Sequence, residues 1–281
     1  MTILHTRLQA KPFFLPSAAG RLFVIYHAPE QHHSDPTNVV LIPPFAEEMN
    51  KSRRTFTLLA HRLAKLGIGT LLFDLYGTGD SEGDFAAARW DIWLQDLDHV
   101  FRWLDQQGSV KVHALGLRLG GALLLDYYRQ NRRAMEQLIL WQPVTSGQMF
   151  MNQFLRLRLA ADMLADEQSA PSSQDLCQQL ASGQALEVAG YELSAELYSS
   201  IEALRFDDLI AGLDLPVHWF DIIPHADRPI PVASQKAVEQ LATHTLVTSR
   251  TVAGEPFWST PEITVVPELL EHTADLFKDV P

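Results

Sequence analysis

The stretch that decides the fold is KVHALGLRLGGALLL, residues 111–125. The apolar residues before Gly116 predict a buried strand, and those after Gly121 predict a helix. Between them, GLRLG at residues 116–120 has the glycine spacing of a sharp strand-to-helix turn. Small residues let strand and helix approach closely, and the strained turn lifts the central side chain above the strand. The pattern is that of a nucleophile elbow, and its central residue here is Arg118.

Further strands and helices alternate on both sides of this turn. Apolar runs predict strands at residues 20–28, 39–42, 70–73, 138–141 and 217–220, and residues 245–252 are interpreted as the last strand. Amphipathic spacing predicts helices at 52–65, 90–104 and 233–241. Short, wholly apolar runs are typical of strands that are buried on both faces of a parallel sheet. The alternation therefore predicts an α/β protein with a mainly parallel central sheet covered by helices on both faces.

The alternation breaks between residues 144 and 208. This segment combines a helical stretch rich in Met and Phe with a long polar run. We interpret it as an inserted lid or cap, so residues 1–143 and 209–281 form the α/β core. A length of 281 residues fits one such domain better than two independent ones.

The composition excludes several kinds of partner. A formal net charge of −12 argues against nucleic acid, because neutralising phosphates needs clustered Lys and Arg. No stretch approaches the ~20 consecutive apolar residues of a membrane span, and the N-terminus lacks the apolar run of a signal peptide. The one cysteine, Cys177, rules out an intramolecular disulfide and suits a reducing compartment. We expect a cytoplasmic protein without membrane span, metal or cofactor, and its oligomeric state stays open.

The elbow in this setting predicts the α/β-hydrolase fold, whose enzymes use a nucleophile, an acid and a histidine in that chain order. Arg118 occupies the nucleophile position. A guanidinium has a pKa above ~12 and stays protonated in proteins, so it does not attack a carbonyl. This position is therefore incompatible with a covalent acyl-enzyme.

The other two positions differ from each other. Asp227 follows the strand predicted at residues 217–220 and matches the loop that presents the acid. The loop after the last predicted strand, where the histidine is expected, carries Glu255 beside a glycine. The histidines downstream of Asp227 are His244, before that strand, and His272, on a predicted C-terminal helix. Neither lies in the expected loop.

These replacements make physical sense together. Burying Arg118 without a counter-ion would cost several kcal/mol, and Asp227 and Glu255 are placed to supply carboxylates. We expect an Arg–Glu–Asp charge cluster where the catalytic relay would be. Two interpretations stay open. The cluster is a structural ion-pair network, or Arg118 keeps spare donors for a carboxylate, phosphate or sulfate ligand.

Backbone donors for an anion are predicted beside the elbow. The N–H groups of Phe45, after the strand at residues 39–42, and of Leu119 match the oxyanion positions. Glu47 and Glu48 follow on the same loop and either shape a ligand pocket or form a solvated helix start. A separate histidine, His113, lies inside the elbow strand and is interpreted as a core residue with hydrogen-bond partners.

Four segments carry a resemblance to a known family: PPFAEEMNKSRR at residues 43–54, GLRLG at 116–120, AGY at 189–191 and GEPFW at 254–258. Together they resemble the exosortase A system-associated hydrolase 2 family of the α/β-hydrolase superfamily. The resemblance covers nearly the whole chain. It implies a bacterial protein whose gene lies near PEP-CTERM sorting and exopolysaccharide loci, and it does not by itself imply activity.

Three functional hypotheses follow. In the first, the hydrolase site is degenerate and binds a small-molecule ligand of acyl, glycan or other anionic type. In the second, Asp227 or Glu255 activates a water for ester or thioester hydrolysis while Arg118 stabilises negative charge. In the third, the chain is a non-catalytic scaffold that binds proteins of the same locus through its lid.

Overall fold

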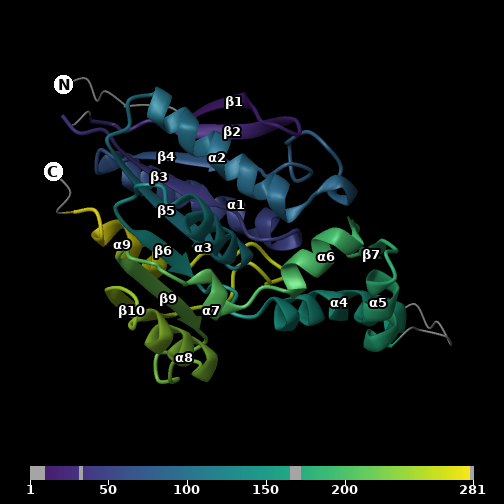
Figure 1. Ribbon diagram of the computed structural model, residues 1–281. Coiled ribbons are helices and arrows are strands. Elements are labelled where there is room, and N and C mark those ends of the chain that lie inside the picture. The colour runs from purple at the N-terminus through teal and green to yellow at the C-terminus, as the bar shows by residue number, and fades with distance from the viewer. Residues whose placement is uncertain (1–9, 32–33, 165–171, 279–281) are drawn as a thin grey trace.

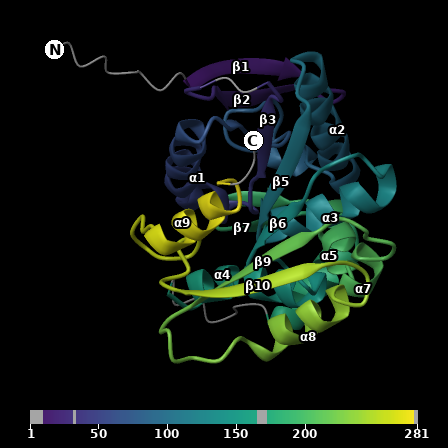
Figure 2. The same cartoon turned by 90° about the vertical axis from the view of Figure 1, so that its left-hand side faces the viewer.

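A computed structural model describes residues 10–31, 34–164 and 172–278 (Figures 1 and 2). In this part of the chain, eight strands form one sheet in the order β1-β2-β4-β3-β5-β6-β9-β10. The strands are β1 (Ala10–Pro16), β2 (Arg21–His27), β3 (Thr37–Ile42), β4 (Gly69–Phe73), β5 (Lys111–Leu117), β6 (Leu138–Trp141), β9 (Val217–Ile223) and β10 (Val247–Ala253). From β4 to β10 along this order, all neighbouring strands are parallel. Strand β2 is antiparallel to both of its neighbours, β1 and β4. The predicted mainly parallel sheet is confirmed.

Helices cover both faces of the sheet, as Figure 2 shows. One face carries α1 (Glu47–Lys65) and α9 (Pro267–Asp275), and the other carries α2 (Trp90–Gln106), α3 (Leu119–Asn131) and α8 (Val232–Leu241). Successive side chains of a strand point to opposite faces. In β5, Val112 and Ala114 accordingly pack into one core, and Leu115 and Leu117 pack into the other. This two-sided burial explains the wholly apolar runs.

The segment between β6 and β9 carries its own small elements. They are α4 (Gly147–Leu164), α5 (Ser173–Ala181), β7 (Leu186–Val188), β8 (Tyr191–Leu193), α6 (Ala195–Glu202) and α7 (Phe206–Leu209). Figure 1 shows α4, α5, α6 and β7 gathered beyond one end of the sheet. The segment begins directly after β6, so it lies at the end of the sheet where the parallel strands have their C-termini. The division into core and lid at residues 144 and 208 stays a prediction, and residues 165–171 within it lie outside the described part. Among the described helices, none combines the length and apolarity needed to cross a bilayer.

His113 is buried, as expected, but the prediction of hydrogen-bond partners is wrong. The side chain is 3% exposed and packs edge-on against Phe277, with 4.9 Å between ring centres. Neither ring nitrogen has a hydrogen-bond partner in the part of the chain that the structure describes. Burial lowers the pKa of His113 to about 4, and nearby His218 and Lys111 act in the same direction. The neutral imidazole is therefore the folded form.

Replacing His113 with leucine is expected to stabilise the protein, more so in acid. The depressed pKa means that the unfolded chain binds a proton more readily, so wild type loses stability as pH falls from about 6.5 toward 4. Removing the group should raise the free energy of unfolding by about 1 kcal/mol at pH 7.5. By pH 5 the gain should grow by roughly 2 kcal/mol more.

Urea unfolding at both pH values checks this, with His244→Gln as an exposed control. Burial also lowers the pKa of His27 to about 4 and raises that of Asp96 to about 6. These two groups are present in wild type and in the variant, so the comparison isolates His113. A gain that is the same at pH 7.5 and pH 5 would contradict the assignment.

Candidate functional site

The elbow has the predicted geometry. Arg118 lies between the last residue of β5 and the first of α3, with φ 54° and ψ −120°. A Cβ atom on Gly120 would lie 2.4 Å from the carbonyl oxygen of Pro43 and 2.6 Å from that of Ile42. A Cβ atom on Gly116 would lie 2.5 Å from the Cα of Gly121. The glycines are required by space, because backbone atoms occupy the places of their side chains.

A second strained residue lies opposite the elbow. Ala46, directly before α1, has φ 51° and ψ −125°, nearly the same conformation as Arg118. The strands that lead into these residues, β3 and β5, are neighbours, with Ile42 paired to Gly116. The N-termini of α1 and α3 therefore begin side by side. Helix N-termini carry partial positive charge and favour anions, and backbone strain of this kind is concentrated at functional sites.

Phe45 and Leu119, whose N–H groups we predict to be donors for an anion, lie at these two turns. Phe45 precedes the strained Ala46, and Leu119 is the first residue of α3. Among the described residues, neither the N–H of Phe45 nor that of Leu119 donates to a protein acceptor. Two backbone donors thus remain for a ligand, which matches an oxyanion-type arrangement.

Arg118 pairs with Glu48. Its Nε–H donates to Oε1 of Glu48 at 3.2 Å, and the guanidinium lies over the rings of Phe150 and Trp258, 5.7 and 5.4 Å from their centres. The Arg118 side chain is 17% exposed and Glu48 is 19% exposed. A guanidinium has five N–H donors. Within the described chain, the four on the terminal nitrogens of Arg118 have no protein acceptor.

Glu48 is the unusual member of this pair. Its Oε2 is buried and has no hydrogen-bond partner among residues 10–31, 34–164 and 172–278. Burial raises the pKa of Glu48, and the charge and hydrogen bond of Arg118 oppose that rise. The positive charge and the hydrogen bond of Arg118 therefore favour the ionised form of this carboxyl group, against the effect of burial.

Arg118 opens onto a pocket of about 330 Å³. Its walls come from the start of α1, the elbow, helix α4 and the segment after β10. The lining residues are Phe45, Glu47, Glu48, Lys51, Arg118, Phe150, Gln153, Phe154, Leu157, Trp258 and Ser259. The pocket thus joins a charged end at Arg118 to a largely apolar wall on α4.

The two other predicted acids follow the expected strands but do not pair with Arg118. Asp227 lies in the loop after β9 and Glu255 lies two residues after β10, and both are exposed. In the described part of the chain no ion pair joins either of them to Arg118. The carboxylate that lies beside Arg118 belongs to Glu48, and not to Asp227 or Glu255. Glu48 reaches Arg118 because β3, which leads into α1, is next to β5 in the sheet. Any catalytic role of Asp227 and Glu255 stays a prediction.

Several site residues were missed or underestimated by sequence reasoning. Phe150 lies in the Met- and Phe-rich lid stretch and Trp258 in the GEPFW segment, but neither was assigned to Arg118. His272 contacts Glu268 and Asp275 of its own helix, and His244 is exposed in a turn. Among the described residues, no group of three or more His, Cys, Asp or Glu is arranged to hold a metal ion.

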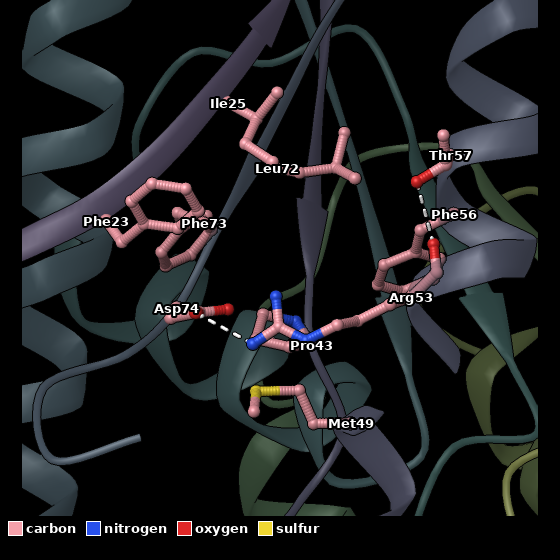
Figure 3. Close-up of a pocket in the computed structure, with 10 residues that line it drawn as sticks. All are labelled: Phe23, Ile25, Pro43, Met49, Arg53, Phe56, Thr57, Leu72, Phe73 and Asp74. Atoms are coloured by element: carbon pink, nitrogen blue, oxygen red, sulfur yellow. Dashed lines mark hydrogen bonds and ion pairs between the residues drawn. The ribbon is translucent and has the colours of Figure 1, made fainter. Parts of the chain in front are cut away.

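A second, smaller pocket lies on the other side of α1, between this helix and strands β2 and β4. It measures about 120 Å³ and its lining is mostly apolar (Figure 3). In Figure 3 the guanidinium of Arg53 points toward Asp74, and Nη2 of Arg53 lies 2.8 Å from Oδ2 of Asp74. Oδ2 of Asp74 also accepts a hydrogen bond from the N–H of Asp80 at 2.9 Å. This pair ties α1 to the loop after β4, which is a structural role.

Comparison with known proteins agrees with the fold. The family profile described as "Serine aminopeptidase, S33" matches residues 36–189, which is more than half of the chain. A search of curated proteins gives no match. Among solved structures, Est1E from Butyrivibrio proteoclasticus with bound ferulic acid is similar at a TM-score of 0.69 and 15% identity, over 95% of this chain and 96% of that one.

Two further structures span both chains almost completely. A soluble variant of monoglyceride lipase from Saccharomyces cerevisiae, in complex with a substrate analog, has a TM-score of 0.65 and 12% identity, with 98% and 97% covered. Alpha/beta hydrolase domain-containing protein 10 from mouse has a TM-score of 0.61 and 17% identity, with 97% and 100% covered. At such identities the likeness concerns the fold alone. The predicted α/β-hydrolase fold is confirmed.

Proposed function

Since this chain belongs to the family described as serine aminopeptidase, S33, yet carries arginine at the centre of its elbow, we propose that it binds a ligand without forming an acyl-enzyme. The ligand is a carboxylate with an apolar body. One observation carries this proposal. Arg118 has four N–H donors without an acceptor among the described residues, and it borders a 330 Å³ pocket whose wall on α4 is apolar.

The charge balance of the pocket favours a carboxylate over a phosphate. Arg118 and Lys51 supply two positive charges, and Glu47 and Glu48 supply up to two negative ones. A monoanion therefore suits this site better than a dianion. A guanidinium binds a carboxylate through two parallel hydrogen bonds, and the neighbouring helix N-termini add partial positive charge.

The apolar body of the ligand is matched by Phe45, Phe154 and Leu157 on the pocket wall. Proteins of this fold provide precedents. Est1E has been solved with ferulic acid, which is a carboxylic acid, and the yeast monoglyceride lipase with a substrate analog. These precedents support an acid or acyl ligand for this chain.

The biological setting that we propose is the bacterial exosortase/PEP-CTERM and exopolysaccharide system. Its support is the resemblance of residues 43–54, 116–120, 189–191 and 254–258 to the exosortase A system-associated hydrolase 2 family. In that setting the ligand is of acyl or glycan type.

A second candidate function is hydrolysis by a carboxylate-activated water. The two backbone N–H groups of Phe45 and Leu119 that lack acceptors favour it, because they would stabilise an oxyanion. The acids that we predict to activate the water are Asp227 and Glu255. Both are exposed, which makes binding without catalysis the stronger proposal.

Decanoate is expected to bind wild type at least about tenfold more tightly than 1-decanol does. Hydrogen bonds to charged groups contribute about 1.5–3 kcal/mol to the binding free energy, and 1-decanol has no charged group. In the double variant Arg118→Met/Glu48→Gln, which removes the ion pair but keeps its bulk, the preference should disappear. Isothermal titration of both ligands measures it.

Arg102→Met is the matched control, because it removes one exposed positive charge on α2, away from the pocket lining. It should keep the preference for decanoate. Equal affinities for decanoate and 1-decanol in wild type would refute the proposal. Turnover of short-chain esters that is lost in Asp227→Asn or Glu255→Gln would instead support the hydrolase.

A further inference from the structure

The ring of Phe45 lies between aromatic residues of helix α4 and aromatic residues of the core. The ring is buried, with 3% exposure. On one side it contacts the lid rings of Phe150 and Phe154, with centres 5.7 and 4.9 Å away. On the other it contacts Phe85 and Trp93, at 5.5 and 6.1 Å. Such edge-to-face contacts hold the ring in one place.

Two cavities meet at this ring. One is the 330 Å³ pocket that contains Arg118. The other lies behind Phe45, toward α2 and α3, and measures about 10 Å³, so it holds one water at most. Its wall is apolar and buried, and includes Trp90, Trp93 and Leu123. Phe45 is the one side chain that lines both cavities among the described residues.

The two directions away from Arg118 differ in what they offer an apolar tail. Along α4 the pocket leads to Leu157, which is 49% exposed, so a tail that passes this residue gains little by burial. Behind Phe45 the surroundings are buried, but the ring blocks the way. A tail is therefore confined to the α4 side while Phe45 is in place.

We propose that the ring of Phe45 determines the length of the apolar tail that this pocket binds, by closing it off from the apolar interior behind. This inference rests on the proposed binding of a carboxylate at Arg118. Removing the ring would join the two cavities and give a longer tail a buried path. Phe45 then acts on tail length through its side chain and on the anion through its backbone N–H.

The test is titration of wild type and variants with straight-chain saturated carboxylates of increasing length. Each buried methylene contributes about 0.8 kcal/mol, or about fourfold in affinity. For wild type the affinity should rise by this factor and then stop rising at one chain length. For Phe45→Ala the rise should continue for at least about two more methylenes, a gain of about tenfold or more for the longest acids.

Two further variants keep the test decisive. Phe45→Leu should shift the limit in the same direction by a smaller amount, and it serves if Phe45→Ala does not fold. Phe85→Leu removes a ring that contacts Phe45 but lines neither cavity, so its limit should equal that of wild type. An unchanged limit in the Phe45 variants, or an equal shift in Phe85→Leu, would overturn the inference. Failure of wild type to bind any of the acids would overturn the carboxylate proposal, and this inference with it.

Discussion

Gly120→Ala is expected to lower the free energy of unfolding by about 3–5 kcal/mol, because the new Cβ has no space. It would lie 2.4 Å from the carbonyl oxygen of Pro43 and 2.6 Å from that of Ile42. Both obstacles are backbone atoms at the end of β3, and they yield only if strand and helix separate. Overpacking a well-filled interior costs about 1–3 kcal/mol, and this contact is tighter than that range describes.

The matched control is Gly108→Ala, whose new Cβ would meet nothing within 4 Å. Gly108 has φ 77°, so its replacement costs only the strain of holding alanine in the left-handed conformation, about 1 kcal/mol. Urea unfolding of both variants measures the difference. If Gly120→Ala loses no more stability than Gly108→Ala, the close approach of α3 to β3 at the elbow is not as described.

Arg118→Met is expected to lower the free energy of unfolding by about 2–3 kcal/mol at pH 8. The loss comes from Glu48, whose Oε2 is buried and whose charge is then uncompensated. Breaking a fully buried ion pair costs about 3–5 kcal/mol, and the partial exposure of both side chains reduces that figure here.

The sign of the pH dependence is set by Glu48. Burial already raises its pKa with Arg118 present, and removing Arg118 raises it further. A carboxyl group with a raised folded-state pKa favours folding at low pH, and that contribution is lost as pH rises. The destabilisation by Arg118→Met should therefore be smaller at pH 5 than at pH 8.

A double-mutant cycle isolates the ion pair. Glu48→Gln in the Arg118→Met background removes the uncompensated charge, so it should restore most of the lost stability at pH 8. Chemical unfolding at pH 5 and pH 8 gives all terms of the cycle. A loss that is independent of pH, or additive losses in the double variant, would show that Glu48 is not held by Arg118.

The predicted elements that rest on local patterns agree with the structure, and the exceptions have identifiable causes. Apolar runs identified β2, β3, β4, β5, β6 and β9, because burial in the sheet leaves few polar residues in them. Strand β10 was also predicted, although it is an edge strand whose residues are mostly polar and exposed. Strand β1 was missed because Pro12 and Pro16 interrupt its pattern, and proline is tolerated there because β1 is an edge strand. Helix α1 begins at Glu47, earlier than the predicted residue 52, because acidic residues in its first turn favour the helix N-terminus.

The sequence by itself determined the elbow and its central arginine. Glycine spacing and a guanidinium's fixed charge are local properties, so Arg118 and its inability to act as a nucleophile needed no knowledge of the fold. It also determined that Asp227 and Glu255 follow the strands β9 and β10, because chain order decides this.

Only the tertiary structure decided which carboxylate Arg118 meets. Glu48 is 70 residues from Arg118 in the chain and becomes its partner because β3 lies next to β5 in the sheet. The rings of Phe150 and Trp258 reach the guanidinium from helix α4 and from the segment after β10. Contacts between distant segments depend on strand order and on the path of the segment between β6 and β9, and neither property is encoded in a local pattern of residues.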